Sequence, residues 1–160
     1  MRAPHPKTII VALLSAGFVI LAAYFIVMNV VTLPRAEATL DRAAVRLEAP
    51  PALVLGERGA LVLHVDNRAN RDAVRFRDVL VSPSLTELLH FGGETLRAQG
   101  ASQEGDRITW NRDVPGGSAA EITLPFQARK AGRHQGALLV LFEVPRMTKG
   151  KSVPLTIEVR

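Results

Sequence analysis

The chain has no cysteine among its 160 residues, so disulfides, thiolate metal sites and cysteine nucleophiles are excluded. Aromatic residues are scarce, with one tryptophan, one tyrosine and six phenylalanines, which leaves little material for an aromatic ligand groove. Acidic residues are missing before Glu37, and the only basic residues before Leu33 are Arg2 and Lys7. Residues 34–160 hold 18 basic and 15 acidic residues, and this mild net charge of +3 argues against a nucleic-acid partner that needs a concentrated basic face.

Sequence signatures of catalysis and of metal binding are missing as well. There is no Gly-x-Ser-x-Gly elbow, Walker loop, dinucleotide-binding fingerprint or HExxH motif. The four histidines lack the spacing that places two imidazoles on one metal ion, and the three methionines do not cluster. The loop 66–72 has four side chains with oxygen ligands, but Arg68 and Arg71 lie among them, and Asx turns explain its composition better than calcium. We therefore expect no enzyme activity, no cofactor and no metal site.

What the sequence does contain is a long apolar segment near its start. From Ile9 to Leu33 there are 25 residues without a charge. At about 1.5 Å per residue, a helix of this length crosses a hydrocarbon core of about 30 Å with some tilt. A cleaved signal peptide is the alternative, since 36–38 offers a small-x-small cleavage pattern, but signal-peptide cores run only about 7–15 residues. The segment predicts a transmembrane helix at 9–33 after a tail at 1–8.

The orientation of this helix is not decided by charge, because basic residues lie on both sides of it. Arg2 and Lys7 precede the helix, and Arg35, Arg42 and Arg46 follow it closely. A first helix after a short tail acts as a signal anchor, which predicts a cytoplasmic tail and an extracytoplasmic domain. With 16 arginines against 4 lysines and abundant alanine, we expect a bacterial protein, with the helix in the inner membrane and the domain in the periplasm.

One side of the helix is a candidate contact surface. Ala12, Ser15, Ala16 and Gly17 are small enough to let another helix approach, and Asn29 adds a polar group near the outer end. These residues predict a helix–helix contact. The alternative is ordinary helix composition, with Asn29 already reaching interfacial water.

Beyond the helix the apolar pattern changes. Residues 34–44 are rich in alanine and charge without Gly or Ser, which predicts a short stalk, helical or not, that keeps the domain near the bilayer. Apolar residues then alternate with polar ones, as in half-buried strands, with frequent turn residues between them. Residues 84–97 fit either a strand or one or two helical turns. The predicted strands are 43–48, 60–66, 74–81, 106–111, 119–128, 136–144 and 152–159.

Seven or eight short strands in about 115 residues predict an all-β fold, an immunoglobulin-like β-sandwich over 45–160. Alternation points Trp110, the single tryptophan, inward, and Phe126 lies on the inner side of its strand. We expect both residues in the core between the sheets. A ligand platform is the alternative role for Trp110.

Several segments of this region follow one another in a familiar order. A strand over 61–67 that ends in an asparagine is followed by the strand with Trp110, a Pro-Gly-Gly-Ser turn at 115–118, an apolar strand and an Ala-Gly turn at 131–132. Over residues 60–144 this order resembles the bacterial immunoglobulin-like repeat domains of the CARDB and related conserved-repeat type. That family usually has a glycine soon after the asparagine, where this chain reads Arg-Ala-Asn at 68–70. The resemblance implies a non-catalytic extracytoplasmic module for spacing, adhesion or assembly.

The predicted strand 136–144 is apolar on both faces. One face belongs to the core, so the other needs cover from a loop of the same domain or from a partner. The partner alternative makes this a partner-facing strand, through Leu139 or Leu141.

Two predicted loops are basic. If the strands alternate in direction, the loops at 66–73, 98–105 and 129–135 return to the bilayer. The first and third are then expected to face anionic headgroups or the acidic rim of a membrane partner, with a solvated rim as the alternative. The hairpin at 146–151 is basic too and falls at the outer end. The residues of the two loops are Arg68 and Arg71 in the first, and Arg129, Lys130 and Arg133 in the third.

These observations predict a non-catalytic single-pass membrane protein whose domain is an accessory subunit of a larger complex, such as a respiratory, photosynthetic, secretion or envelope assembly. The expected partners are the lipid bilayer and an integral membrane protein, without nucleic acid. The alternatives are an envelope adhesion or ligand-binding module and an extracytoplasmic assembly factor.

Overall fold

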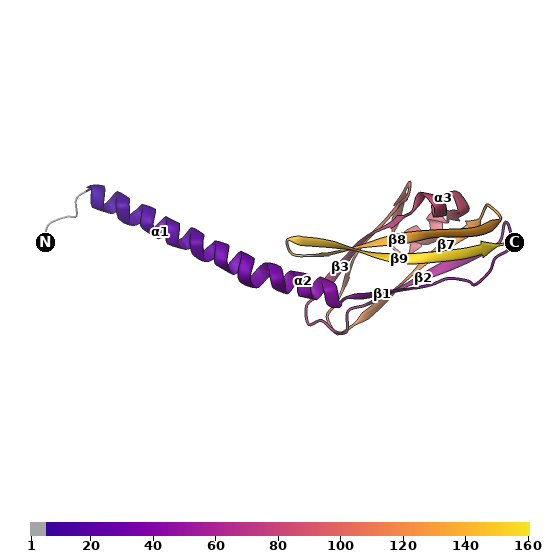
Figure 1. Cartoon of the computed structure of the whole chain (residues 1–160), viewed down its shortest axis with the longest axis horizontal. Coiled ribbons are helices and arrows are strands. Elements are labelled where there is room, and N and C mark those ends of the chain that lie inside the picture. The colour runs from indigo at the N-terminus through magenta and orange to yellow at the C-terminus, as the bar shows by residue number, and fades with distance from the viewer. Residues whose placement is uncertain (1–5) are drawn as a thin grey trace.

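A computed structural model describes residues 6–160, with side chains described from Leu13 onward apart from Gly93 and Thr95. The chain starts as one continuous helical rod, which projects from one end of a β-sandwich (Figure 1). Within the described residues, the segment Leu13–Arg42 is long and apolar enough to cross a membrane or to serve as a signal sequence, and its apolar window is not buried. The parts of the rod are α1 (Pro6–Ile26), a π-helical segment η1 (Val27–Thr32) and α2 (Leu33–Arg42).

Local chemistry accounts for the irregular segment and for the end of the rod. Pro34 has no N–H to donate to the preceding turn, and the wider π-helical turns lie directly before it. Ala43 adopts an extended backbone, with φ −62° and ψ 124°, and ends the helix. The stretch expected as a stalk is therefore mostly helical and continues the apolar segment without a break.

The rest of the chain forms two antiparallel sheets with the strand orders β1-β2-β7-β4 and β5-β6-β3-β8-β9. After the rod the fold is mostly β, with two antiparallel sheets, as the alternating pattern predicts. The open segment 84–97 becomes two short helices with a short strand between them. The bounds are β1 (Ala44–Glu48), β2 (Arg58–Asp66), β3 (Val74–Val81), α3 (Pro83–Leu88), β4 (Leu89–Phe91), α4 (Gly93–Ala98), β5 (Ser102–Glu104), β6 (Arg107–Val114), β7 (Ala119–Ala128), β8 (Gly132–Val144) and β9 (Met147–Val159).

The antiparallel pairing sorts the loops between the two ends of the sandwich. Because α2 leads into β1, the strands β1, β3, β7 and β9 run away from the helix, and β2, β6 and β8 run back toward it. We call the two ends the helix end and the far end. The helix end holds the loops 67–73, 115–118 and 145–146. The far end holds 49–57, the segment 82–101, the loop 129–131 and Arg160.

The core lies between the two sheets and is built around edge-to-face aromatic contacts. The ring of Phe76 lies 6.2 Å from that of Trp110 and 5.8 Å from that of Phe142, and Phe91 lies 6.4 Å from Phe126, measured between ring centroids. Trp110 and Phe126, the two aromatic residues expected in the core, have exposed fractions of 7% and 3%. A ligand platform on Trp110 is therefore excluded by burial.

Candidate functional site at the helix end

The last turns of the helical rod belong to the domain. Leu40 and Ala43 are fully buried in the core, Thr39 is buried to 7% exposure, and Ala36 packs against the same cluster. Burial of a leucine side chain stabilises a fold by about 1.5–3 kcal/mol. The rod is thus joined to the sandwich by core packing as well as by the peptide chain.

Two buried asparagines tie the helix to the loop after β2. The Asn70 side-chain amide donates to the carbonyl of Thr39 at 2.8 Å and to the side chain of Asn67 at 2.7 Å. The Asn67 amide in turn donates to the carbonyl of Asp72 in its own loop, and to those of Val114 and Pro115 where β6 leads into the neighbouring loop, over 2.9–3.1 Å. These bonds give the two asparagines of the loop a structural role, because their buried amides donate to backbone carbonyls. The asparagines in this loop therefore need no calcium ion to explain them.

Gly116 makes this arrangement possible from the opposite loop. A Cβ atom at this position would lie 2.2 Å from the carbonyl oxygen of Arg71, which is far inside contact distance. Only glycine allows the 115–118 turn to approach the 67–73 loop so closely. The two loops therefore form one compact support for the end of α2.

Charged side chains fix the other sides of α2. Arg35 donates to both carboxylate oxygens of Asp72 over 2.9–3.2 Å. From the hairpin of β8 and β9, Lys149 reaches Asp41 at 2.5 Å, and Lys151 donates to the carbonyl of Asp41 at 2.9 Å and to that of Ala43. Lys149 lowers the pKa of the Asp41 carboxyl, and Asp41 raises the pKa of Lys149. Burial of the Lys151 ammonium lowers its pKa.

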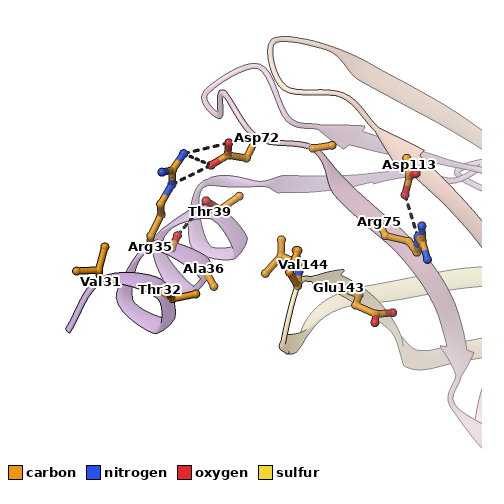
Figure 2. A pocket seen from close by; sticks show the side chains of 12 residues that line it. Val31, Thr32, Arg35, Ala36, Thr39, Asp72, Arg75, Asp113, Glu143 and Val144 are labelled. Atoms are coloured by element: carbon orange, nitrogen blue, oxygen red, sulfur yellow. Dashed lines mark hydrogen bonds and ion pairs between the residues drawn. The ribbon is translucent and has the colours of Figure 1, made fainter. Parts of the chain in front are cut away.

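Between the helix and these loops lies an open cleft of about 670 Å³. Figure 2 shows Arg35 paired with Asp72 on one side, Arg75 paired with Asp113 on the other, and small side chains between them. The Arg75 guanidinium lies 2.9 Å from Asp113 and lowers the pKa of that carboxyl. The lining residues are Val31, Thr32, Arg35, Ala36, Thr39, Asp72, Ala73, Arg75, Asp113, Glu143, Val144 and Pro145.

Several polar side chains of this lining are paired within the chain. Its arginines are held in ion pairs, and the Thr39 hydroxyl donates to the carbonyl of Arg35 at 2.9 Å. Its carboxylates are those of Asp72, Asp113 and Glu143, and the twelve lining residues include no histidine, cysteine or lysine. Across the described residues, no group of three His, Cys, Asp or Glu side chains is placed to hold a metal ion.

The two basic loops predicted to share one end lie at opposite ends. Arg68 and Arg71 are at the helix end, where Arg68 pairs with Asp66 at 2.7 Å and lowers the pKa of that carboxyl. Arg129, Lys130 and Arg133 are at the far end, so the expectation that 129–135 returns toward the helix is wrong. The expectation counted the segment 84–97 as a full strand that returns to the helix end. In the structure the segment 82–101 stays at the far end, so every later strand runs in the direction opposite to the expected one.

The same reversal brings the hairpin 145–146 to the helix end. Sequence reasoning placed its basic residues at the outer end and missed their contacts with the helix. Lys149, Lys151 and Arg146 all contact the rod, as does the buried Asn70, whose amide also donates to Asn67. Only a correct strand count could have found the lysines and the arginine from the sequence.

The residues predicted to contact another helix lie apart from the domain. Ser15, Ala16 and Gly17 are exposed on the rod, and the space around a Cβ at Gly17 is open. Asn29 donates to the carbonyl of Phe25 at 2.9 Å, so its amide is satisfied within the helix. Ala12 lies outside the residues with described side chains. The helix–helix contact remains a prediction.

Leu139 and Leu141 lie on the outer face of the second sheet and are half-buried. Leu80 lies opposite Leu139 in the neighbouring strand, and Gly150 leaves room for both leucines, because a Cβ there would meet them at 2.8 and 3.2 Å. The apolar character of this face is therefore partly accommodated by neighbouring strands. Contact with a partner through this strand remains a prediction.

Comparison with known proteins identifies the fold alone. No family model and no curated protein matches the chain. Among solved structures, the crystal structure of native alpha-2-macroglobulin from Escherichia coli, spanning domain MG7 to the C-terminus, is similar to it with a TM-score of 0.51 and 14% sequence identity. The match covers 74% of this chain and 17% of that chain, so this chain corresponds to a small part of the larger protein. The domain is thus an immunoglobulin-like β-sandwich, preceded by an apolar helix.

Proposed function

We propose that this chain is a non-catalytic single-pass membrane protein whose immunoglobulin-like domain serves as an accessory subunit of a larger membrane complex. The observation that carries the proposal is the docking of α2, whose final turns contact the loop after β2 and the hairpin of β8 and β9 while their apolar side chains enter the core. The domain is in this way a rigid extension of the apolar helix.

Rigidity limits what such a domain can reach. A flexible linker would let the module search for distant ligands, whereas a fixed rod holds it at one height and one angle above the membrane surface. Fixed geometry also lowers the entropy cost of binding a neighbour that is fixed in the same way. The partner that suits this arrangement is an integral membrane protein beside the helix, reached through Ser15, Ala16 and Gly17 or through Leu139 and Leu141.

The membrane setting is part of the proposal. Its support is the uncharged segment from Ile9 to Leu33, long enough for a bilayer, together with the cluster of ion pairs that begins directly after it at Arg35. An inner-membrane helix with a periplasmic domain fits the short basic tail and the resemblance of residues 60–144 to CARDB-type repeat domains. Alkaline-phosphatase fusions after Thr39 and after Arg160 test the orientation. Both should be active, and inactivity at both points would overturn it.

The accessory role is tested by purification of the tagged full chain in mild detergent, followed by mass spectrometry. A stoichiometric integral membrane protein is expected. The double substitution Asn70→Ala/Lys149→Ala should loosen the domain from the helix and reduce recovery of the partner while the chain still inserts. Glu158→Gln, which removes an exposed ion pair with Arg160 at the far end, is the matched control and should leave recovery unchanged. A chain that purifies alone, as a monomer, from its native membrane contradicts the proposal.

One observation favours an adhesion or ligand-binding module as the second candidate. Val54 and Leu55 at the far end are 62% and 52% exposed, and they are the large apolar side chains left bare by the domain among the described residues. The backbone N–H of Leu55 donates to the carbonyl of Arg160, and that of the following Gly56 donates to the carbonyl of Ala128, which the basic loop 129–131 adjoins. Loss of surface adhesion in a Val54→Ser/Leu55→Ser variant that keeps its membrane partner would favour this second function.

A further inference from the structure

The tip of the hairpin between β8 and β9 lies against the apolar part of the helix. Arg146 extends its guanidinium to the Tyr24 hydroxyl at 3.5 Å, lies 6.0 Å from the centre of the Tyr24 ring, and contacts the sulfur of Met28. Tyr24 and Met28 are one helical turn apart and belong to the uncharged segment that ends at Leu33. A charged side chain of the domain is thus held beside residues that a bilayer would surround.

Arg146 differs from three cations near it at this end of the molecule. Arg35, Arg75 and Lys149 each have a carboxylate within 2.9 Å or less. Among the ion pairs of the described residues none includes Arg146, whose contacts are a phenol, a ring face and a thioether. Its positive charge is therefore uncompensated within the domain.

The backbone at Arg146 is also unusual. Its φ of 72° is in the left-handed region, directly after Pro145 in a two-residue turn between Val144 and Met147. A proline followed by a residue with positive φ is the pattern of a type II turn, where the second position normally holds glycine or asparagine. An arginine in this position costs free energy that a glycine would not, and such strain is found at functional positions.

The position of Arg146 along the helix corresponds to the outer edge of a bilayer. About 20 residues of helix cross the hydrocarbon core, so its outer edge falls between Met28, when the span begins at Ile9, and Leu33, when it begins at Leu14. At about 1.5 Å per residue, Met28 is then about 0–8 Å inside this edge and Tyr24 about 6–14 Å inside it, and the guanidinium lies beside both. A cation at that depth extends toward the interface and needs a counter-ion there.

We infer that Arg146 binds the phosphate of an outer-leaflet phospholipid, with its guanidinium held on the face of Tyr24. The inference rests on the proposed membrane anchoring of the helix. Guanidinium pairs with phosphate through two parallel hydrogen bonds, and a ring on one side orients the planar group for this pairing. The hairpin then acts as a second membrane contact, which fixes the rotation of the domain about its helix.

The test uses the full chain in vesicles of phosphatidylcholine and phosphatidylglycerol, with carbon-13 in the arginine guanidinium groups. Dipolar dephasing by lipid phosphorus in solid-state NMR detects guanidinium groups next to phosphate. The chain has 16 arginines, so each contributes about one sixteenth of the total guanidinium signal. Arg146→Gly should remove about that amount from the part of the signal that phosphorus dephases. Glycine suits the left-handed backbone there, so this variant should fold. Arg129→Gly, at the far end, is the matched control and should leave the dephased signal unchanged.

Single-cysteine spin labels separate failure of this inference from failure of the anchoring, because the natural chain has no cysteine. A label at Ile20→Cys should lie deep in the bilayer, one at Thr148→Cys at the interface, and one at Ala131→Cys in water. If the label at 20 is exposed to water, the anchoring fails and the inference with it. If that label is deep but Arg146→Gly leaves the phosphorus dephasing unchanged, the inference alone is overturned.

Two further outcomes also overturn it. Inorganic phosphate added to the detergent-solubilised chain should give no Arg146-dependent dephasing, since the bilayer places the phosphate, and an equal signal there would mean a phosphate site independent of lipid. Loss of a copurified acidic partner in Arg146→Gly, without any change in phosphorus dephasing, would assign the counter-ion to a protein.

Discussion

The two ends of the sandwich use similar residues for different purposes. At the helix end, basic and amide side chains meet acids and carbonyls of the same chain, as in the pairs Arg35–Asp72 and Asp41–Lys149 and in the bonds of Asn70. At the far end, the basic loop 129–131 lies on the surface beside the exposed Val54 and Leu55. One end is occupied by the chain's own helix, and the other faces outward.

The comparison teaches that a cluster of charge in a sequence does not show what the cluster contacts. The sequence alone does not distinguish the lysines of the hairpin from the basic residues of the loop 129–131. Topology alone gives the hairpin lysines an internal partner. Arg146 has no carboxylate partner in the described residues and lies beside Tyr24 and Met28 of the apolar segment, and this position is why it carries the inference of a lipid contact.

Removal of the core tryptophan is the strongest test of whether the two ends are parts of one unit. Trp110→Ala should lower the free energy of unfolding of the full chain in detergent by about 3–5 kcal/mol, as large-to-small aromatic substitutions in cores do. Circular dichroism should show one transition. Fluorescent labels at Thr148→Cys and Ala131→Cys should report the same shifted midpoint. Separate midpoints at the two labels would mean that the ends unfold independently.

Substitution of glycines distinguishes close packing at the helix end from turn geometry at the far end. Gly116→Ala forces a methyl group against the carbonyl of Arg71 and should lower the free energy of unfolding by about 2–3 kcal/mol, as overpacking does. Gly100→Ala, at φ 77° with open space around it, should cost about 1 kcal/mol through backbone strain. Denaturant titration of both variants measures the difference. Equal costs would show that the two loops at the helix end can move apart freely.

Much of the fold could be predicted from alternation. The strands 74–81 and 119–128 have the predicted bounds, and five others are recovered with shifted ends. The inward positions of Trp110 and Phe126 follow from the same period of two. Alternation works here because each sheet has one face on the core, so burial repeats along every strand.

The candidate site could not be predicted in the same way, because it depends on the direction of strands. Leucines at helical spacing in 84–97 left that segment open, and counting it as a strand reversed the ends of everything after it. The contacts of Asn70 with Thr39 and of Arg146 with Tyr24 join residues that are far apart in the chain. The alternation of apolar residues along one strand does not indicate which distant residues that strand will contact.

Loss of the asparagine contact should loosen the helix from the sandwich. Asn70→Ala removes two buried hydrogen bonds and leaves the carbonyl of Thr39 with only the N–H of Ala43, at 3.3 Å, which should lower the free energy of unfolding by about 1–3 kcal/mol. Gln127→Ala, which removes an exposed amide bond to Gly56 at the far end, should cost less than about 1 kcal/mol. Hydrogen exchange of the amides in α2 should rise in the first variant only. Unchanged exchange in Asn70→Ala would show that core packing alone holds the rod.

Acid should weaken the helix end before the far end. The carboxyl groups with displaced pKa values in the described residues, Asp41, Asp66 and Asp113, all lie at the helix end, and each pKa is lowered by a neighbouring cation. A lowered pKa stabilises the fold above the ordinary value of 3.8, and this contribution is lost as the pH falls through the lower folded value. Spin labels on the rod and the hairpin should therefore separate as the pH falls from about 5 to about 2. In Asp41→Asn, the distance between the two labels should increase less over the same pH range. An increase as large as in the natural chain would exclude the Asp41–Lys149 pair as its cause.

The smallest effect is expected where the chain leaves apolar side chains bare. Val54→Ser/Leu55→Ser should change the free energy of unfolding by no more than about 0.5 kcal/mol, because side chains that are 62% and 52% exposed gain little from folding. The neighbouring Leu53, with 4% exposure in the same loop, is the matched comparison. Leu53→Ser should cost several kilocalories per mole, since it leaves a cavity and buries a hydroxyl. Denaturant midpoints decide the matter: if the double variant is destabilised as strongly as Leu53→Ser, the far end is packed like the helix end, and the contrast between the two ends does not hold.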